Sequence, residues 1–175
     1  MSSSTEHGAA AKDCEYSEFL EIMRGLPLFA RVPLEVSKVL AYLSQAETFQ
    51  PGDFLVREGE HAEAFFYLTR GRLQVTRQAN GSAVSVKELG PGASFGGLAL
   101  ILGAKSLYSV SAMEEAEVMI LAREKFLKTV QRFPQVEPAL LRSLAEHVLA
   151  WEERFLNRHP EEFASLGRDF GLSLF

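Results

Sequence analysis

The sequence predicts a mainly β protein with flanking helices. Its centre is expected to be an eight-stranded antiparallel β-roll, a double-stranded β-helix of the jelly-roll type, with helices before it and two helices after it. Short apolar or alternating runs separated by glycine fill residues 46–121, which is typical of a closed roll. Apolar residues recur at helical spacing on both sides of that region. The length of 175 residues, with 47% of them hydrophobic, suits one domain with a proper core.

Two short helices are predicted before the roll. Apolar side chains at helical spacing predict the first over residues 16–24, and Gly25 and Pro27 end it. The second helix follows a bend, with Pro33 in its first turn, where a missing backbone N–H is tolerated.

Two dipeptides predict tight turns within the roll. Pro51-Gly52 suits a type II turn, and Asn80-Gly81 is the preferred two-residue hairpin turn. The strands are predicted in the arms of that hairpin and in the runs "FLVRE", "AFFYLT", "LYSVSA" and "AEVMILA".

The helical period returns after the roll. The run "REKFLKTVQRF" predicts one helix, Pro134 breaks it, and residues 136–158 predict the longest helix of the chain. This last helix carries an apolar stripe made of Leu141, Leu144, Val148, Trp151 and Phe155. Such a stripe is typical of a helix that pairs with another surface.

These boundaries divide the chain into three parts. Residues 1–14 are small and polar, and we expect them to form a mobile tail. Residues 15–158 are the folded domain, with the roll at 46–121 and the C-terminal helices at 122–158. Residues 159–175 are a short tail rich in phenylalanine and leucine.

Composition argues against several classes of protein. The net charge of -5, without a cluster of lysine and arginine, disfavours a nucleic-acid surface. The longest apolar run falls short of the roughly 20 residues that cross a bilayer. Cys14 is the only cysteine, and the first residues lack the basic and apolar regions of a signal peptide. We therefore expect a cytoplasmic protein that binds neither DNA nor a membrane.

The run "QPGDFLVREGEHAEAFFYLTRGRLQV" resembles the cyclic nucleotide-binding domain family. Gly52, Gly59 and Gly71 fall where strands turn tightly and a Cβ would clash. The likeness extends over residues 16–158 and implies helices, an eight-stranded roll and two further helices. It also implies a regulatory role, in which the last helix is both the lid over a ligand and a common dimer seam.

The stretch "FGGLALILGAKSLYSV" resembles the phosphate-binding cassette of that family. The positions that match are Phe95, Gly96, Leu98, Ala99, Leu100, Ser109 and Val110. In the family, backbone N–H groups at the start of a short helix face the cyclic phosphate, an arginine pairs with its charge, and a glutamate accepts a hydrogen bond from the ribose 2′-hydroxyl. Here Gly97 stands at the glutamate position, Ser106 at the arginine position, and Leu107 where a threonine or serine is common.

The loss of those two side chains predicts weak binding. Hydrogen bonds to a charged group contribute ~1.5–3 kcal/mol each. Losing both costs on the order of 4–6 kcal/mol, or about a thousandfold or more in affinity. We expect no resident cofactor, and a cyclic nucleotide or other small anion would be held only weakly. Lys105 precedes the arginine position by one residue, and adjacent side chains of an extended segment point to opposite faces. A solvated lysine is the preferred interpretation, and replacement of the arginine is the alternative.

A plainer interpretation of the cassette stays open. The apolar side chains of Phe95, Leu98, Leu100 and Leu102 would then pack the roll interior, and the paired glycines would only allow a sharp turn. For a filled pocket, the apolar plugs nearest at hand in the sequence are Phe163, Phe170, Leu172 and Phe175.

The predicted function is a non-catalytic regulatory or sensor module that signals through its C-terminal helix, without tight binding of cAMP or cGMP. We expect a homodimer through the stripe on that helix, and a protein partner. The first alternative is a functional cAMP- or cGMP-binding regulator with a non-standard pocket. The second is a cupin-like metalloenzyme, which would need several inward histidines, whereas only His61 falls in the strand region. No catalytic or metal-binding residue is predicted.

Overall fold

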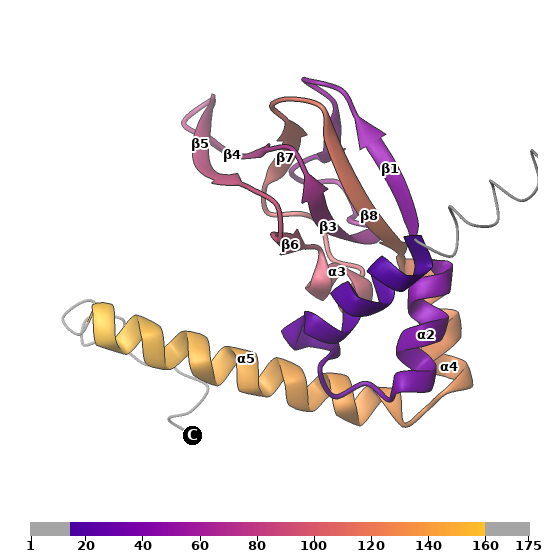
Figure 1. Cartoon of the computed structure of the whole chain (residues 1–175). Helices are drawn as coiled ribbons and strands as arrows, with labels where there is room; N and C mark the ends of the chain where they lie inside the picture. Colours follow the sequence, from indigo (N-terminus) through magenta and orange to yellow (C-terminus); the bar gives the residue numbers. More distant parts are fainter. Residues whose placement is uncertain (1–14, 160–175) are drawn as a thin grey trace, which may run out of the picture.

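The computed structural model describes residues 15–159 and has a β-roll at its centre (Figure 1). Eight strands form two four-stranded sheets, in the orders β1-β8-β3-β6 and β2-β7-β4-β5. The strands are β1 Gln45–Phe49, β2 Phe54–Val56, β3 Ala64–Arg70, β4 Leu73–Ala79, β5 Ser82–Leu89, β6 Ser94–Phe95, β7 Ser109–Ala112 and β8 Ala116–Ala122. All of their pairings are antiparallel. The predicted eight-stranded roll is confirmed, and its limits differ from the prediction by one residue at each end.

Both predicted turns have the backbone geometry that their residues favour. Asn80 and Gly81 have φ values of 52° and 80°, the double positive φ of a type I′ hairpin between β4 and β5. Gly52 has a φ of 92°, and Asp53 N donates to Gln50 O at 2.9 Å to close that turn.

The roll interior is apolar and closely packed. Leu68, Leu73, Val110 and Val118 are fully buried between the two sheets. Phe66 of β3 stacks on Phe95 of β6, with ring centroids 4.9 Å apart. This stack fixes the strand that leads into the cassette.

Several helices gather at one end of the roll (Figure 1). They are a helix at residues 15–25, the 3-10 turn η1 (Pro27–Phe29), α2 (Leu34–Leu43) and α4 (Arg123–Arg132). Their apolar faces form a second core, in which Phe29 meets Phe65 of β3 edge to face at 5.6 Å. Pro33 was predicted in the first turn of α2 but stands one position earlier, at its N-cap, where its carbonyl accepts from Val36 and Ser37.

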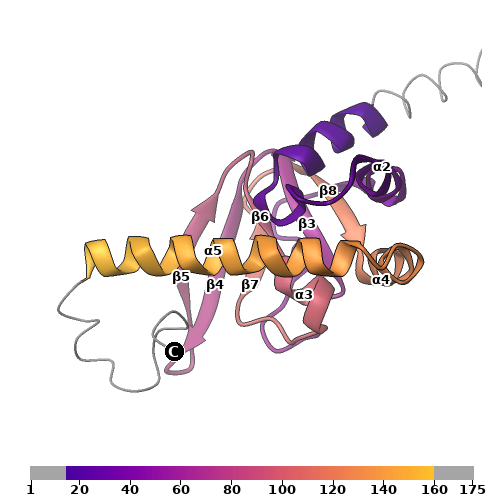
Figure 2. The same ribbon diagram turned by 90° about the horizontal axis from the view of Figure 1, so that it is seen from below.

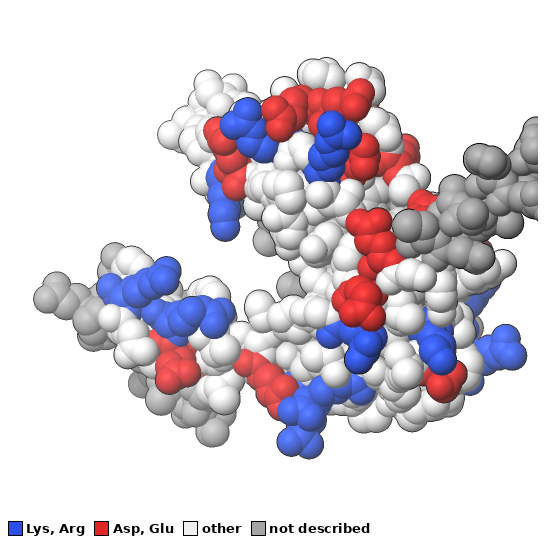
Figure 3. Space-filling model, in the orientation of Figure 1, with Lys and Arg blue, Asp and Glu red and all other residues white. Residues whose placement is uncertain are grey.

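The long helix α5 (Val136–Arg158) crosses beneath the roll (Figure 2). Its first half packs on η1, with Val136, Leu140 and Ser143 buried. Its second half leaves an open notch below the roll, and charges of both signs are interspersed over this face (Figure 3). Among residues 15–159, no helix is long and apolar enough to span a membrane. The expectations for residues 1–14, for Cys14 and for the tail after His159 lie outside the described residues.

Candidate functional site: the cassette and its surroundings

The cassette folds as a short strand, one helical segment and a second strand. After β6, the chain turns at Gly96 into α3 (Gly97–Leu102) and then runs into β7. Gly96 has a φ of 83°, and a Cβ there would collide with the carbonyl oxygen of Ala64 in β3. Glycine at this position therefore lets the start of α3 lie directly on β3.

The side chains of α3 are divided between the core and the surface. Ala99 and Leu100 are buried, whereas Leu98 and Leu102 are 60% and 68% exposed. Residues four apart share one helix face, so these two leucines point away together. The packing in the roll interior suggested for Leu98 and Leu102 is therefore wrong. Leu100 is buried, but in the core that the helices form, whereas the half-buried Phe95 packs against the core of the roll.

Leu28 of η1 packs beside Gly97. A Cβ at Gly97 would lie 3.0 Å from Leu28 Cδ2, which is closer than an ordinary van der Waals contact. A glutamate at this position would start against Leu28, so the leucine would have to move.

The polar groups of Ser106 are engaged within the chain. Its hydroxyl donates to Tyr108 O at 2.6 Å. Its backbone N–H donates to Glu60 O, and its carbonyl accepts from Gly59 N, both at 2.8 Å. The backbone of Ser106, at the arginine position, is thus hydrogen-bonded to the loop between β2 and β3. The neighbouring Leu107 is 74% exposed.

Lys105 also contacts the loop between β2 and β3. It forms an isolated antiparallel bridge with His61, and its side chain is exposed. His61 Nδ1 lies 2.9 Å from Gly103 O. Farther along, Ser109 Oγ accepts from Glu58 N at 3.0 Å, and the Glu58 carboxylate accepts from Gln78 N at 2.7 Å.

Tyr108, just before β7, is a titratable residue whose pKa the fold changes. It is half-buried, and its burial raises the pKa of the phenol. The phenol therefore stays neutral at physiological pH and offers no charge to an anion.

Two cavities are lined by residues outside the cassette, and the first of them adjoins it, since His61 bridges to Lys105 and Phe66 stacks on Phe95. One of about 200 Å³ opens between the β2–β3 loop and β3, lined by residues that include Arg57, His61 and Phe66. The other is a groove of about 800 Å³ between the first helix and the end of α2, with Lys125 at its edge. Within residues 15–159, no three His, Cys, Asp or Glu side chains gather to hold a metal ion.

The stripe predicted on α5 is only partly covered. Leu141 and Trp151 are 69% and 45% exposed, and Leu144, Val148 and Phe155 are half-buried. None of the five belongs to either hydrophobic core of the described chain. The helix attaches to the body through a neighbouring face instead.

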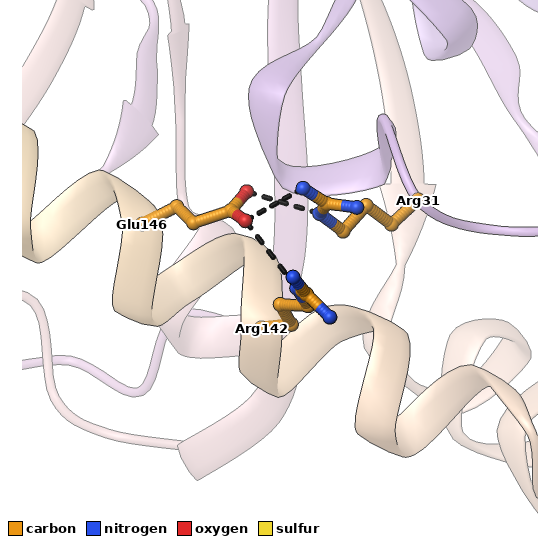
Figure 4. A network of polar contacts seen from close by, with 3 residues as sticks. All are labelled: Arg31, Arg142 and Glu146. Atoms are coloured by element: carbon orange, nitrogen blue, oxygen red, sulfur yellow. Dashed lines mark hydrogen bonds and ion pairs between the residues drawn. The ribbon is translucent and has the colours of Figure 1, made fainter.

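Sequence reasoning missed an ionic contact that holds α5. Arg31, just after η1, donates through Nε and Nη2 to the two carboxylate oxygens of Glu146, at 3.0 and 2.6 Å (Figure 4). Arg142 Nε adds a weaker contact to the same carboxylate at 3.4 Å. The hydrogen bond from Arg31 lowers the pKa of Glu146. The two partners are 115 residues apart, so no local sequence pattern predicts the pair.

Comparison with known proteins identifies the family. The family model of the cyclic nucleotide-binding domain matches residues 46–133. The cGMP-dependent protein kinase 2 of Mus musculus is 31% identical over 136 residues, which cover 75% of this chain and 17% of the kinase. The chain belongs to the cyclic nucleotide-binding domain family. Domains of this family are regulatory, and the matched residues include the glycine-spaced roll and the stretch at 95–110.

Two further similar proteins come from Thermus thermophilus and Streptomyces coelicolor A3(2). The cyclic AMP receptor protein of Thermus thermophilus is 30% identical over 128 residues, which cover 72% of this chain and 59% of that protein. The N-terminal domain of a transcriptional regulator from Streptomyces coelicolor A3(2) has a TM-score of 0.66 at 25% identity, covering 75% of this chain and 95% of the solved one. The chain spans less than two thirds of the full length of the kinase and of the receptor protein.

Proposed function

We propose that this chain is a regulatory module that transmits a change at its cassette through α5, without tight binding of cAMP or cGMP. The observation that carries the proposal is the set of hydrogen bonds that Ser106 makes within the chain. The serine there directs its hydroxyl to Tyr108 O, and its backbone is bonded to the β2–β3 loop. No guanidinium stands at this position to pair with a cyclic phosphate.

The surroundings of α3 support weak binding as well. A cyclic phosphate that enters this site gives up water and finds neither the arginine nor the glutamate of the family, so its charge is poorly paired. Lys105 is the only cation within residues 95–110; its backbone forms the bridge with His61 and its side chain is exposed, where water screens its charge.

The segment from Leu28 to Arg31 supports signalling through α5. Leu28 stands against Gly97 of the cassette. Three residues later, Arg31 holds Glu146 of α5. One short segment therefore contacts both the candidate sensor and the candidate output, which is a physical route for coupling between them.

Isothermal titration with cAMP and with cGMP tests the binding half of the proposal. We expect no binding in the micromolar range for either nucleotide. Sub-micromolar binding of either one would overturn the proposal, because another group must then perform the work of the arginine.

Hydrogen exchange tests the signalling half. Replacing Arg31 by alanine removes the bidentate contact, so amides of residues 136–147 should exchange faster, and those of α3 should change with them. Arg24→Ala is the matched control, since Arg24 pairs with Glu21 on its own helix at 3.2 Å. If exchange in α3 is the same in both variants, η1 does not couple the two elements.

A further inference from the structure

Arg123 makes an unusual contact for the first residue of a helix. It opens α4, directly after β8, and its backbone N–H donates to Glu63 O at 2.8 Å. Its side chain turns back to the cassette, where Nε donates to Ala99 O at 3.1 Å and Nη2 approaches Ile101 O at 3.5 Å. The guanidinium thus meets carbonyls at the C-terminal end of α3, where positive charge is favourable.

Gly103, which follows the last residue of α3, leaves room for this guanidinium. Gly103 has a φ of 61°, and a Cβ there would lie 3.0 Å from Arg123 Cζ and Nη2. The same glycine donates from its N–H to Ala99 O at 2.9 Å, so this one carbonyl receives both the helix bond and the arginine. On the other side, Gly103 O lies 2.9 Å from His61 Nδ1.

The two ends of α3 are therefore held differently. At the Gly103 end, side chains from α4 and from the β2–β3 loop are directed to its backbone. At the Gly97 end, the backbone of Gly96 packs against β3 and the apolar tip of Leu28 lies beside Gly97, so this end is held by packing. We propose that Arg123 is a positioning residue that pins the C-terminal end of α3 to the start of α4. The inference rests on the proposed role of the cassette as a sensor.

Hydrogen exchange in the ligand-free full chain tests Arg123 directly. The variant Arg123→Met keeps the length and apolar stem of the side chain and removes the donors. We expect amides of residues 97–103 to exchange about tenfold to a hundredfold faster, the change that corresponds to one lost charge-assisted bond. Amides of β4 and α2 should be unchanged.

Arg132→Met is the matched control. Arg132 lies at the other end of α4, is exposed and lies near the ring of Phe133, so the same loss of charge should leave α3 unaffected. Arg123→Lys should give an intermediate rate, because an ammonium supplies a charge and one donor centre without the planar fork. This graded rescue would not follow from a packing role of the stem.

Two results would overturn the inference. One is exchange in α3 that is equal in the Arg123→Met and Arg132→Met proteins. The other is a uniform rise over the whole roll, which would mark Arg123 as a general stabiliser. If the methionine variant does not fold, the lysine variant decides, and an exchange rate equal to that of the parent counts against pinning. The measurement involves no nucleotide and does not monitor α5, so it fails or succeeds separately from the proposed function.

Discussion

Leu28 of η1 packs where the side chain of residue 97 would begin, with its Cδ2 3.0 Å from the position of a Cβ on Gly97. A glutamate at this position, where the resemblance to the family's cassette places one, would therefore begin in contact with Leu28.

The first prediction concerns recovery of nucleotide binding. Gly97→Glu with Ser106→Arg restores both missing side chains and should tighten cAMP binding at least about tenfold, or 1.4 kcal/mol. Adding Leu28→Ala should tighten it further, because the new glutamate no longer meets the leucine. Isothermal titration measures both steps, and Gly97→Gln with Ser106→Arg is the control that lacks only the carboxylate charge. If neither variant improves on the parent, the site is closed by more than Leu28.

The second prediction compares two adjacent glycines. Gly96→Ala should destabilise the fold by roughly 2–4 kcal/mol, since it combines a positive φ with a backbone collision that cannot relax. Gly97→Ala should change stability by less than about 1 kcal/mol, because the helix gains propensity and only the flexible tip of Leu28 must shift. Urea unfolding of the two variants gives the difference, and equal effects would refute the assignment of Gly96 to the contact with β3.

The third prediction is a pH dependence of the Arg31–Glu146 contact. The pKa of Glu146 is lower in the folded chain than its ordinary value of 4.5, so the pair stabilises the fold above that pH. Its contribution is lost as the pH falls through the folded pKa. The difference in Tm between the parent and Glu146→Gln should therefore be present at neutral pH and shrink as the pH falls below 4.5 and through the lowered pKa of Glu146. Glu153→Gln, an exposed change on the same helix, should show no such trend, and a Tm difference that persists in acid would argue against the ion pair.

The fourth prediction concerns the oligomeric state. If the stripe on α5 is a seam between two copies, the parent should sediment as a dimer and Val148→Glu as a soluble monomer. Leu149→Glu is the control, since Leu149 is 57% exposed and lies about 100° around the helix from Val148. A parent protein that is monomeric at high concentration would remove the stripe from consideration as a seam.

The fifth prediction separates the regulatory module from a cupin-like metalloenzyme. Elemental analysis of the purified protein should find no stoichiometric transition metal. One bound metal per chain would reverse the order of the two hypotheses.

The sequence by itself determined the class of fold and suggested, by resemblance, where the cassette lies. Glycine-spaced runs and the Asn80-Gly81 turn predict a roll because turn geometry and strand alternation are local properties of the chain. The substitutions at Gly97 and Ser106 are likewise visible in the sequence. Their chemical consequence follows from residue type, because neither glycine nor serine carries a charge.

Only the tertiary structure decided what surrounds those positions. A short apolar helix such as α3 does not reveal from its sequence which leucines turn inward, and Leu98 and Leu102 proved to be exposed. The contacts of Leu28 with Gly97, Arg31 with Glu146 and Arg123 with Ala99 join segments that are distant along the chain. Such contacts depend on how the helices close around the roll, which is a property of the packed core and not of any local run of residues.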